Sequence, residues 1–324
     1  MVTSPFVAFV DADVVADDPD WIERLAGHFI DPEVAAVAPR VRTRRGPSLR
    51  ERYERDHSPL DLGAAPARVG PGRPVSYVPT AALVARTDVI RTTGGFDAGL
   101  RRGEDVDLVW RLVDAGHDVR YDPSVEMTGA PRPSWRAWVR QRRGYGSTAA
   151  PLGRRHPDKI APARCSPWSA AAWGAAAARH PVIGAGIAAG STTALVKKLD
   201  GVPDPAREAI RLAGPGHLWA GVGLARAVTR VWWPIALAVG LLRPRLRPTL
   251  AVAFAGPALL DWARGRRPAD AVRSVGLRVA DDMVYGVGVW EGMVRHRTLA
   301  PLAPDLREWP GSAAAVERDT VAGS

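Results

Sequence analysis

The chain has 324 residues, 46% of them hydrophobic, so it can bury a sizeable core in one large domain or two smaller ones. Its single cysteine, Cys165, excludes an intrachain disulfide and indicates a reducing, cytoplasmic setting, and we expect no signal peptide. The net charge is +10, and residues 131–160 hold eight Lys or Arg against one acid. This concentration indicates either a solvated basic face or a patch for phosphates, acidic lipid or nucleic acid.

The first motif of the chain is an acidic pair. Residues 6–10 form an apolar run that predicts a buried strand, and Asp11 and Asp13 follow it directly. Side chains two apart in a strand point to the same side, so we expect the two carboxylates to converge. Oxygen ligands of this kind suit Mg²⁺ or Mn²⁺ carrying a diphosphate.

The next segments alternate between predicted helices and strands. Asp18 and Pro19 predict a helix start, as N-cap and first helical residue. Residues 34–41 predict a second strand, and residues 42–74 an exposed excursion with a short helix near 48–57. Two further strands are predicted over 75–85 and 117–123, and two further helices over 105–114 and 134–146. In the helix over 105–114, the periodicity predicts an inward face that consists of Val106, Val109, Trp110 and Val113.

Strands alternating with helices favour an α/β sandwich with a largely parallel sheet over residues 1–160. Residues 161–310 lack strand alternation and predict a helical region, whose longest uncharged run is shorter than the ~20 residues of a spanning helix. That region is either a packed helical appendage or a set of helices lying at a membrane surface, with Trp232, Trp233 and nearby arginines at its margin. Residues 311–324 are expected to form a disordered tail.

A second motif follows the third predicted strand. It comprises Gly94-Gly95-Phe96-Asp97 and then Gly103-Glu104-Asp105-Val106-Asp107-Leu108. Glu104 and Asp105 are either acids stabilised at a helix N-terminus or carboxylates that point into a cleft at the carboxyl edge of the sheet. Asp105 and Asp107 lie about 200° apart on a helix, so only Asp105 faces the sheet together with Val109.

These motifs, in this order and spacing, resemble family 2 glycosyltransferases with the GT-A fold. The stretch from Trp138 to Leu152 and the Ala/Trp-rich second half resemble the mycofactocin-system group within that family. The resemblance implies inverting transfer of a sugar, glucose from UDP-glucose, onto a peptide-derived redox cofactor. The implied partners are a nucleotide-sugar donor and this small-molecule acceptor. A nucleic-acid partner is not expected, because the basic segment has no base-reading module.

The resemblance also implies roles for individual residues. Asp11 and Asp13 match the motif that holds the divalent cation and the diphosphate. Asp105 matches the catalytic base, with Glu104 as its neighbour. The segment that binds acceptor and diphosphate corresponds to Gln141, Arg142, Arg143 and Tyr145.

Two departures from the family pattern leave a second hypothesis open. We expect the chain to lack the family's first βαβ unit, which grips uracil and ribose, because Met1 stands just before the Asp11 strand. No histidine follows the fourth predicted strand, where relatives place one at the metal. The alternative to an active enzyme is therefore a catalytically incomplete remnant that serves as a binding or scaffold protein.

Overall fold

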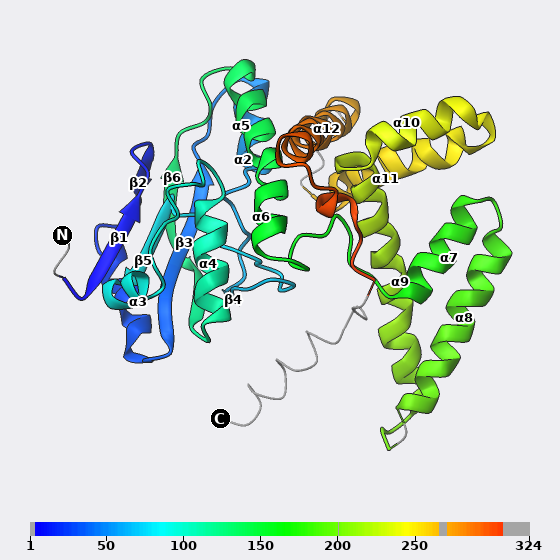
Figure 1. Ribbon diagram of the computed structural model, residues 1–324, viewed down its shortest axis with the longest axis horizontal. Helices are drawn as coiled ribbons and strands as arrows, with labels where there is room; N and C mark the ends of the chain where they lie inside the picture. Colours follow the sequence, from blue (N-terminus) through cyan, green and yellow to red (C-terminus); the bar gives the residue numbers. More distant parts are fainter. Residues whose placement is uncertain (1–3, 200, 266–270, 307–324) are drawn as a thin grey trace. The chain divides into compact units, whose positions relative to one another are not determined.

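The computed structural model describes residues 4–199, 201–265 and 271–306, and they divide into two compact units, Met1–Gln141 and Arg142–Ser324 (Figure 1). The division falls earlier than the boundary expected near residue 160. The expected tail, residues 311–324, lies outside the described residues.

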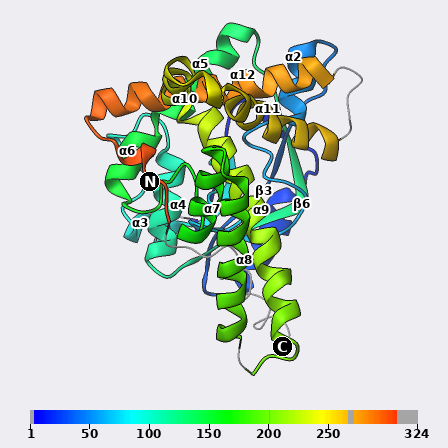
Figure 2. The same cartoon turned by 90° about the vertical axis from the view of Figure 1, so that its right-hand side faces the viewer.

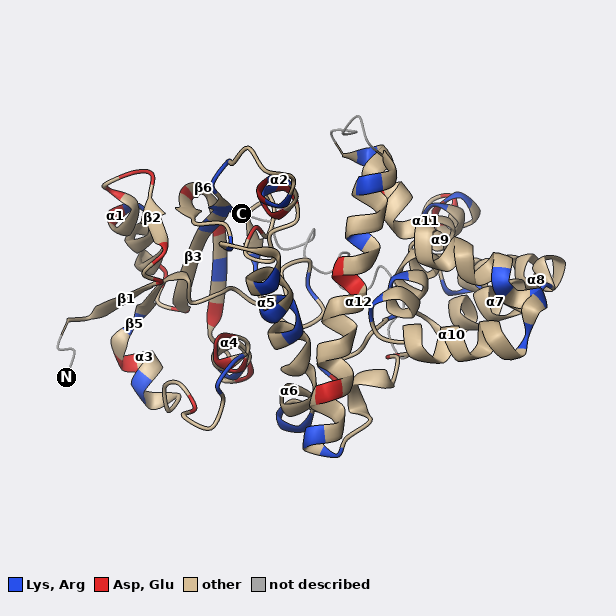
Figure 3. Ribbon diagram, turned by 90° about the horizontal axis from the view of Figure 1, so that it is seen from above, with Lys and Arg blue, Asp and Glu red and all other residues tan. Residues whose placement is uncertain are grey.

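The first unit combines one sheet with helices on both of its faces. Its elements in chain order are β1 (Phe6–Val10), β2 (Val14–Ala16), α1 (Trp21–Ala26), η1 (Gly27–Ile30), β3 (Val34–Thr43), α2 (Leu49–Asp56), β4 (Ala67–Arg68), β5 (Ala82–Arg86), α3 (Thr87–Thr92), α4 (Glu104–Asp114), β6 (Asp118–Gly129) and most of α5 (Trp135–Ser147). Helices α1 and α4 lie on opposite faces of the sheet (Figure 3).

The sheet is mixed, with the strand order β1-β5-β3-β6-β2 and β4 paired to β6. Among the described pairs, β3 and β6 run parallel and the others antiparallel, so the prediction of a largely parallel sheet is wrong. The reason is that β5 enters between β1 and β3 in the opposite direction to both. A count of alternating elements does not reveal where a returning strand inserts.

Strand β1 lies at the edge of the sheet, so it is only half-buried and not the buried strand expected. The strand predicted over 75–85 corresponds to β5, which is shorter than predicted, and the strand predicted over 117–123 corresponds to β6, which is longer than predicted. The short helix expected near 48–57 is confirmed as α2, which begins with a capping box between Ser48 and Glu51.

Helix α1 begins later than predicted. The Asp18 carboxylate accepts a hydrogen bond from the Asp20 N–H at 3.0 Å and pairs with Arg24 at 2.8 Å, and the first helical residue is Trp21. Asp18 therefore closes a local turn ahead of the helix, because an aspartate can hydrogen-bond backbone two residues on as readily as it can cap a helix.

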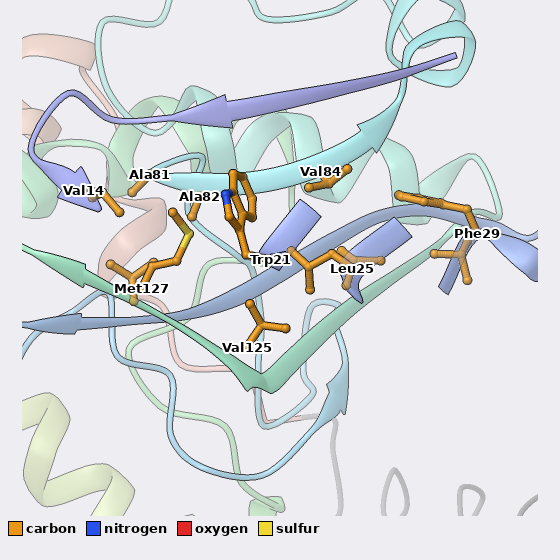
Figure 4. Packing of buried hydrophobic residues seen from close by; sticks show 12 residues of the cluster. Val14, Trp21, Leu25, Phe29, Ala81, Ala82, Val84, Val125 and Met127 are labelled. Atoms are coloured by element: carbon orange, nitrogen blue, oxygen red, sulfur yellow. The ribbon is translucent and has the colours of Figure 1, made fainter. Parts of the chain in front are cut away.

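The core of the first unit lies between α1 and the sheet (Figure 4). Trp21, Leu25 and Phe29 project from α1 and η1 onto apolar residues of the strands. The strand residues that meet them include Val34, Val37, Val41, Val84, Val125 and Met127. Their burial holds the sheet rigid, and the loops at its ends are positioned by it.

The second unit is helical, as expected. Beyond the end of α5 it contains α6 (Ala149–Arg155), α7 (Pro167–Ala177), α8 (Pro181–Lys198), α9 (Pro205–Arg230), α10 (Trp233–Leu242), η2 (Pro244–Leu246), α11 (Arg247–Arg264), α12 (Ala271–His296) and η3 (Ala300–Leu302). Helices α7, α8 and α9 lie side by side (Figure 2). None of the helices in the described ranges is by itself long and apolar enough to cross a bilayer, whereas α9 and α10, bent by 88° at their junction, meet that criterion as a pair.

Candidate active site

Asp11 and Asp13 lie in the tight turn between β1 and β2. The Asp11 N–H donates to the Ala81 carbonyl at 3.0 Å, and the Val14 N–H donates to the Asp11 carbonyl at 3.0 Å. The two aspartates thus follow the strand instead of alternating within it, and a turn rather than strand periodicity sets their relative position. The ladder between β1 and β5 fixes where this turn begins.

The Asp13 side chain has a cationic partner from the far end of the unit. Arg132, which follows β6, donates from Nη2 to Asp13 Oδ2 at 3.0 Å, and the Ala130 N–H donates to the Asp13 carbonyl at 3.0 Å. Burial raises the pKa of Asp11, the Asp13 charge raises it further, and the Arg132 guanidinium lowers it. The turn is therefore a site of concentrated negative charge that a single arginine offsets only in part.

Asp105 stands in the first turn of α4, which follows Gly103 in the left-handed region at φ +78°. This left-handed backbone conformation precedes the first helical residue, and glycine adopts it without strain because it has no Cβ atom. Burial raises the pKa of the Asp105 carboxyl to about 6, the Val106 N–H opposes this by donating to Oδ1 at 2.8 Å, and the charges of Glu104 and Asp11 add to the rise. The two acidic motifs therefore lie within electrostatic reach of each other.

Glu104 is also partly buried. Its Oε2 atom is enclosed and accepts no hydrogen bond within the part of the chain that the structure describes. A buried carboxylate oxygen without a donor is costly, and a hydroxyl group of a bound molecule would satisfy it. The start of α4 appears red in Figure 3, where acidic residues gather.

The Gly94-Gly95 turn holds α4 in place. Both glycines have positive φ, +89° and +65°, and Arg111 of α4 donates to the carbonyls of Thr93 and Gly95 at 2.5 Å. Arg111 is itself oriented by the fully buried Asp107 at 2.8 Å. Asp107 thus has a structural contact with Arg111.

Comparison with known proteins identifies the family of this chain. Residues 6–260 match the model of the "Glycosyl transferase family group 2". The chain is also 39% identical over 318 residues to the "Pre-mycofactocin glycosyltransferase" of Mycobacterium tuberculosis, in strain CDC 1551 / Oshkosh and in strain ATCC 25618 / H37Rv. Each alignment covers 94% of this chain and 67% of the relative.

The chain belongs to glycosyltransferase family 2. It is a glycosyltransferase with an α/β fold of the GT-A type followed by a helical region, as the resemblance implied. In such an enzyme the neighbourhood of Asp11, Asp13 and Asp105 is the natural candidate for the site of transfer. Across the described residues, no group of three or more His, Cys, Asp or Glu side chains is placed to hold a metal ion.

The four residues expected to bind diphosphate and acceptor lie on α5. Arg142 is buried and pairs with Asp281 of α12 at 2.7 Å, so its charge already has an acidic partner, and its binding role stays a prediction. Arg143 pairs with Glu291 of the same helix but is half-exposed. Gln141 and Tyr145 are partly buried, and for them and Arg143 the binding role stays a prediction.

Asp281 and Asp282, which stand next to each other in the sequence, are both buried in the middle of α12. Arg278 lies 3.8 Å from Asp281 and 3.7 Å from Asp282, and Arg230 lies 3.3 Å from Asp282. The pair belongs to an ionic network that ties the helices of the second unit together. Sequence spacing does not distinguish such a network from a cap, since the partners come from distant helices.

The residue that sequence reasoning missed in the first unit is Arg132, which was noted only as one of several basic residues. Its contact with Asp13 joins positions 119 apart in the chain. The only local signal is its position just beyond a strand end, which it shares with many surface arginines.

Proposed function

We propose that the chain transfers glucose from UDP-glucose to a peptide-derived mycofactocin precursor, with inversion at the anomeric carbon. The observation that carries this proposal is the convergence of Asp11, Asp13 and Asp105, together with the pKa of Asp105 raised to about 6. The name of the M. tuberculosis relatives supports the acceptor.

Asp105 is proposed as the base. A carboxylate with a pKa of about 6 is ionised at neutral pH yet accepts a proton more readily than an ordinary aspartate. As the proton of the acceptor hydroxyl passes to Asp105, the acceptor oxygen forms a bond to the anomeric carbon and the bond from that carbon to the diphosphate breaks. The Val106 N–H donates to Asp105 Oδ1 and so fixes the orientation of the carboxylate for this task.

Asp11 and Asp13 would hold a divalent cation, Mg²⁺ or Mn²⁺. The donor set fits a hard ion, because it offers carboxylate oxygens; burial and then the Asp13 charge raise the pKa of Asp11. Two protein ligands leave coordination positions for a diphosphate, as is usual for Mg²⁺ in nucleotide sites. When bound, the cation would supply positive charge that stabilises the departing diphosphate.

The test is a transfer assay on the purified chain with UDP-glucose, the mycofactocin precursor peptide and Mn²⁺ or Mg²⁺, read by mass spectrometry. We expect addition of hexose that EDTA abolishes. Asp105→Asn should lower turnover by about 10²- to 10⁴-fold, the typical contribution of a general base, while UDP binding persists. Glu23→Gln, an exposed acid on α1, is the matched control and should keep full activity.

Two results would contradict the proposal. Near-normal transfer by Asp105→Asn would remove Asp105 from the role of base. Binding of the peptide without any sugar transfer or UDP binding would favour the alternative of a remnant that acts as a binding or scaffold protein.

We further propose that the second unit contacts a membrane surface. Helices α7 and α10 carry no charged residue, and α8 carries none before Lys197, yet large apolar side chains on them are exposed, among them Trp168 at 54%, Val182 at 84%, Leu241 at 74% and Leu242 at 79%. Water-facing helices ordinarily have a polar face. The exposed Arg243, Arg245 and Arg247 follow α10 and would meet anionic headgroups.

A further inference from the structure

Arg132 brings a positive charge to the carboxylate that the proposed function assigns to a divalent cation. Its Nη2 lies 3.0 Å from Asp13 Oδ2, and both side chains are partly exposed, 33% for Arg132 and 41% for Asp13. The contact is thus formed at a site that solvent and ligands reach. A guanidinium and a divalent cation cannot both gain fully from the same carboxylate oxygen, because their charges repel.

The backbone around Arg132 is fixed from two sides. Its N–H donates to Glu54 Oε2 at 2.8 Å, and that buried carboxylate of α2 also accepts from Arg50 at 3.2 Å. Two residues earlier, the Ala130 N–H donates to the Asp13 carbonyl at 3.0 Å. The guanidinium is therefore presented to Asp13 by a braced segment and not by a mobile loop.

We propose that Arg132 makes capture of the cation by Asp13 conditional on the donor's diphosphate. In the absence of donor the guanidinium occupies Asp13 and weakens binding of the cation alone. When a diphosphate is bound, the guanidinium transfers to its oxygens, which match its planar fork, and Asp13 is released to the cation. This inference rests on the proposed function, and it assigns to Arg132 a contact with the nucleoside diphosphate.

Isothermal titration with Mn²⁺ alone and with UDP at saturating Mn²⁺ tests the proposal, because the two affinities should move in opposite directions. In Arg132→Gln we expect Mn²⁺ alone to bind about threefold or more tightly, since its competitor is gone. UDP with Mn²⁺ should bind about tenfold more weakly, since a charge-assisted contact is lost. Arg132→Lys retains the charge without the fork, so Mn²⁺ binding should stay near that of the wild type while UDP binding weakens.

The matched control is Arg45→Gln, which removes an exposed arginine after β3 and should change neither affinity. If Arg132→Gln weakens Mn²⁺ binding as well, Arg132 merely positions the turn and the inference is wrong. Unchanged UDP binding would also overturn it. Failure of the proposed function gives a different result from failure of this inference, because the wild-type chain itself would then bind no UDP at any Mn²⁺ concentration. If Arg132→Gln does not fold, the UDP affinity of Arg132→Lys decides the test.

Discussion

Two neighbouring carboxylates of α4, those of Asp105 and Asp107, have different surroundings and therefore different roles. Asp105 is buried enough for its pKa to rise to about 6, whereas Asp107, two residues on, is fully buried but paired with Arg111 at 2.8 Å. The same side chain thus serves as a candidate base in one position and as a structural brace in the other. The difference follows from which partner each carboxylate meets and not from its burial alone.

The raised pKa of Asp105 predicts that its ionisation destabilises the fold. The folded-state pKa lies above the ordinary 3.8, so the stabilisation from the protonated form is fully present below pH 3.8 and is lost as the pH rises through about 6. Asp105→Asn, which remains neutral, should therefore be more stable than the wild type at pH 8 by about 1–3 kcal/mol. Urea unfolding at pH 8 and at pH 4 measures this difference.

At pH 4 the difference in unfolding free energy between Asp105→Asn and the wild type should become small. Glu23→Gln, with its exposed side chain, serves as the reference at both pH values. An equal gain at pH 4 and pH 8 would mean that the substitution acts through packing or hydrogen bonding and not through the charge.

At the scale of single elements, local patterns predicted the helices better than the strand pairing. Helices α2 and α4 begin close to where their caps and periodicity indicated, because those signals lie within a few neighbouring residues. The inward face of α4 was only partly predicted, since Leu108 and Leu112 are fully buried while Val106 and Val113 are not. Which face meets the sheet depends on the approach of the helix and not on its sequence alone.

Close contact between α5 and α12 within the second unit depends on glycine. A Cβ atom at Gly288 would overlap the Arg143 carbonyl, and one at Gly292 would lie 2.6 Å from the Ser147 carbonyl. Gly146 of α5 meets the Tyr285 backbone in the same way. These positions have no space for a methyl group, so the helices approach nearly backbone to backbone.

Gly288→Ala should therefore destabilise the second unit by about 1–3 kcal/mol or more, because the helices must move apart to admit the methyl group. Gly276→Ala on the same helix is the matched control: a Cβ there meets nothing within 4 Å, and it should stabilise the protein by about 0.5–1 kcal/mol. Urea denaturation followed by tryptophan fluorescence measures both. Equal effects of the two substitutions would contradict the close contact.

Over the whole molecule, charge and apolar surface are distributed unevenly. The chain has a net charge of +10, yet α10 is tan throughout in Figure 3 because it contains no charged residue. Within the second unit, the buried Arg142 and Asp281 neutralise each other at 2.7 Å. Exposed apolar helices followed by exposed arginines at 243, 245 and 247 are the combination that the membrane proposal explains.

Sedimentation with vesicles tests this proposal. The chain should pellet with vesicles that contain phosphatidylglycerol, and binding should weaken as salt is raised. Leu241→Asp with Leu242→Asp should reduce binding about tenfold or more, because two exposed apolar side chains are lost and acidic ones face anionic lipid. Ile30→Asp is the control, since Ile30 is 90% exposed but belongs to the first unit. An equal loss of vesicle binding in both variants would contradict a membrane-binding surface on α10.

The sequence by itself determined the short-range features: the acidic pair after the first strand, the helix that opens with Glu104 and Asp105, the diglycine segment before it, and the helical character of the second half. Each depends on residues a few positions apart, whose caps, turns and periodicity act locally. Only the tertiary structure decided the mixed direction of the sheet, the burial of Arg142 against Asp281 and the contact of Arg132 with Asp13. Those depend on pairs of residues brought together from distant parts of the chain, and the energy of such contacts is set by packing geometry that no local pattern encodes.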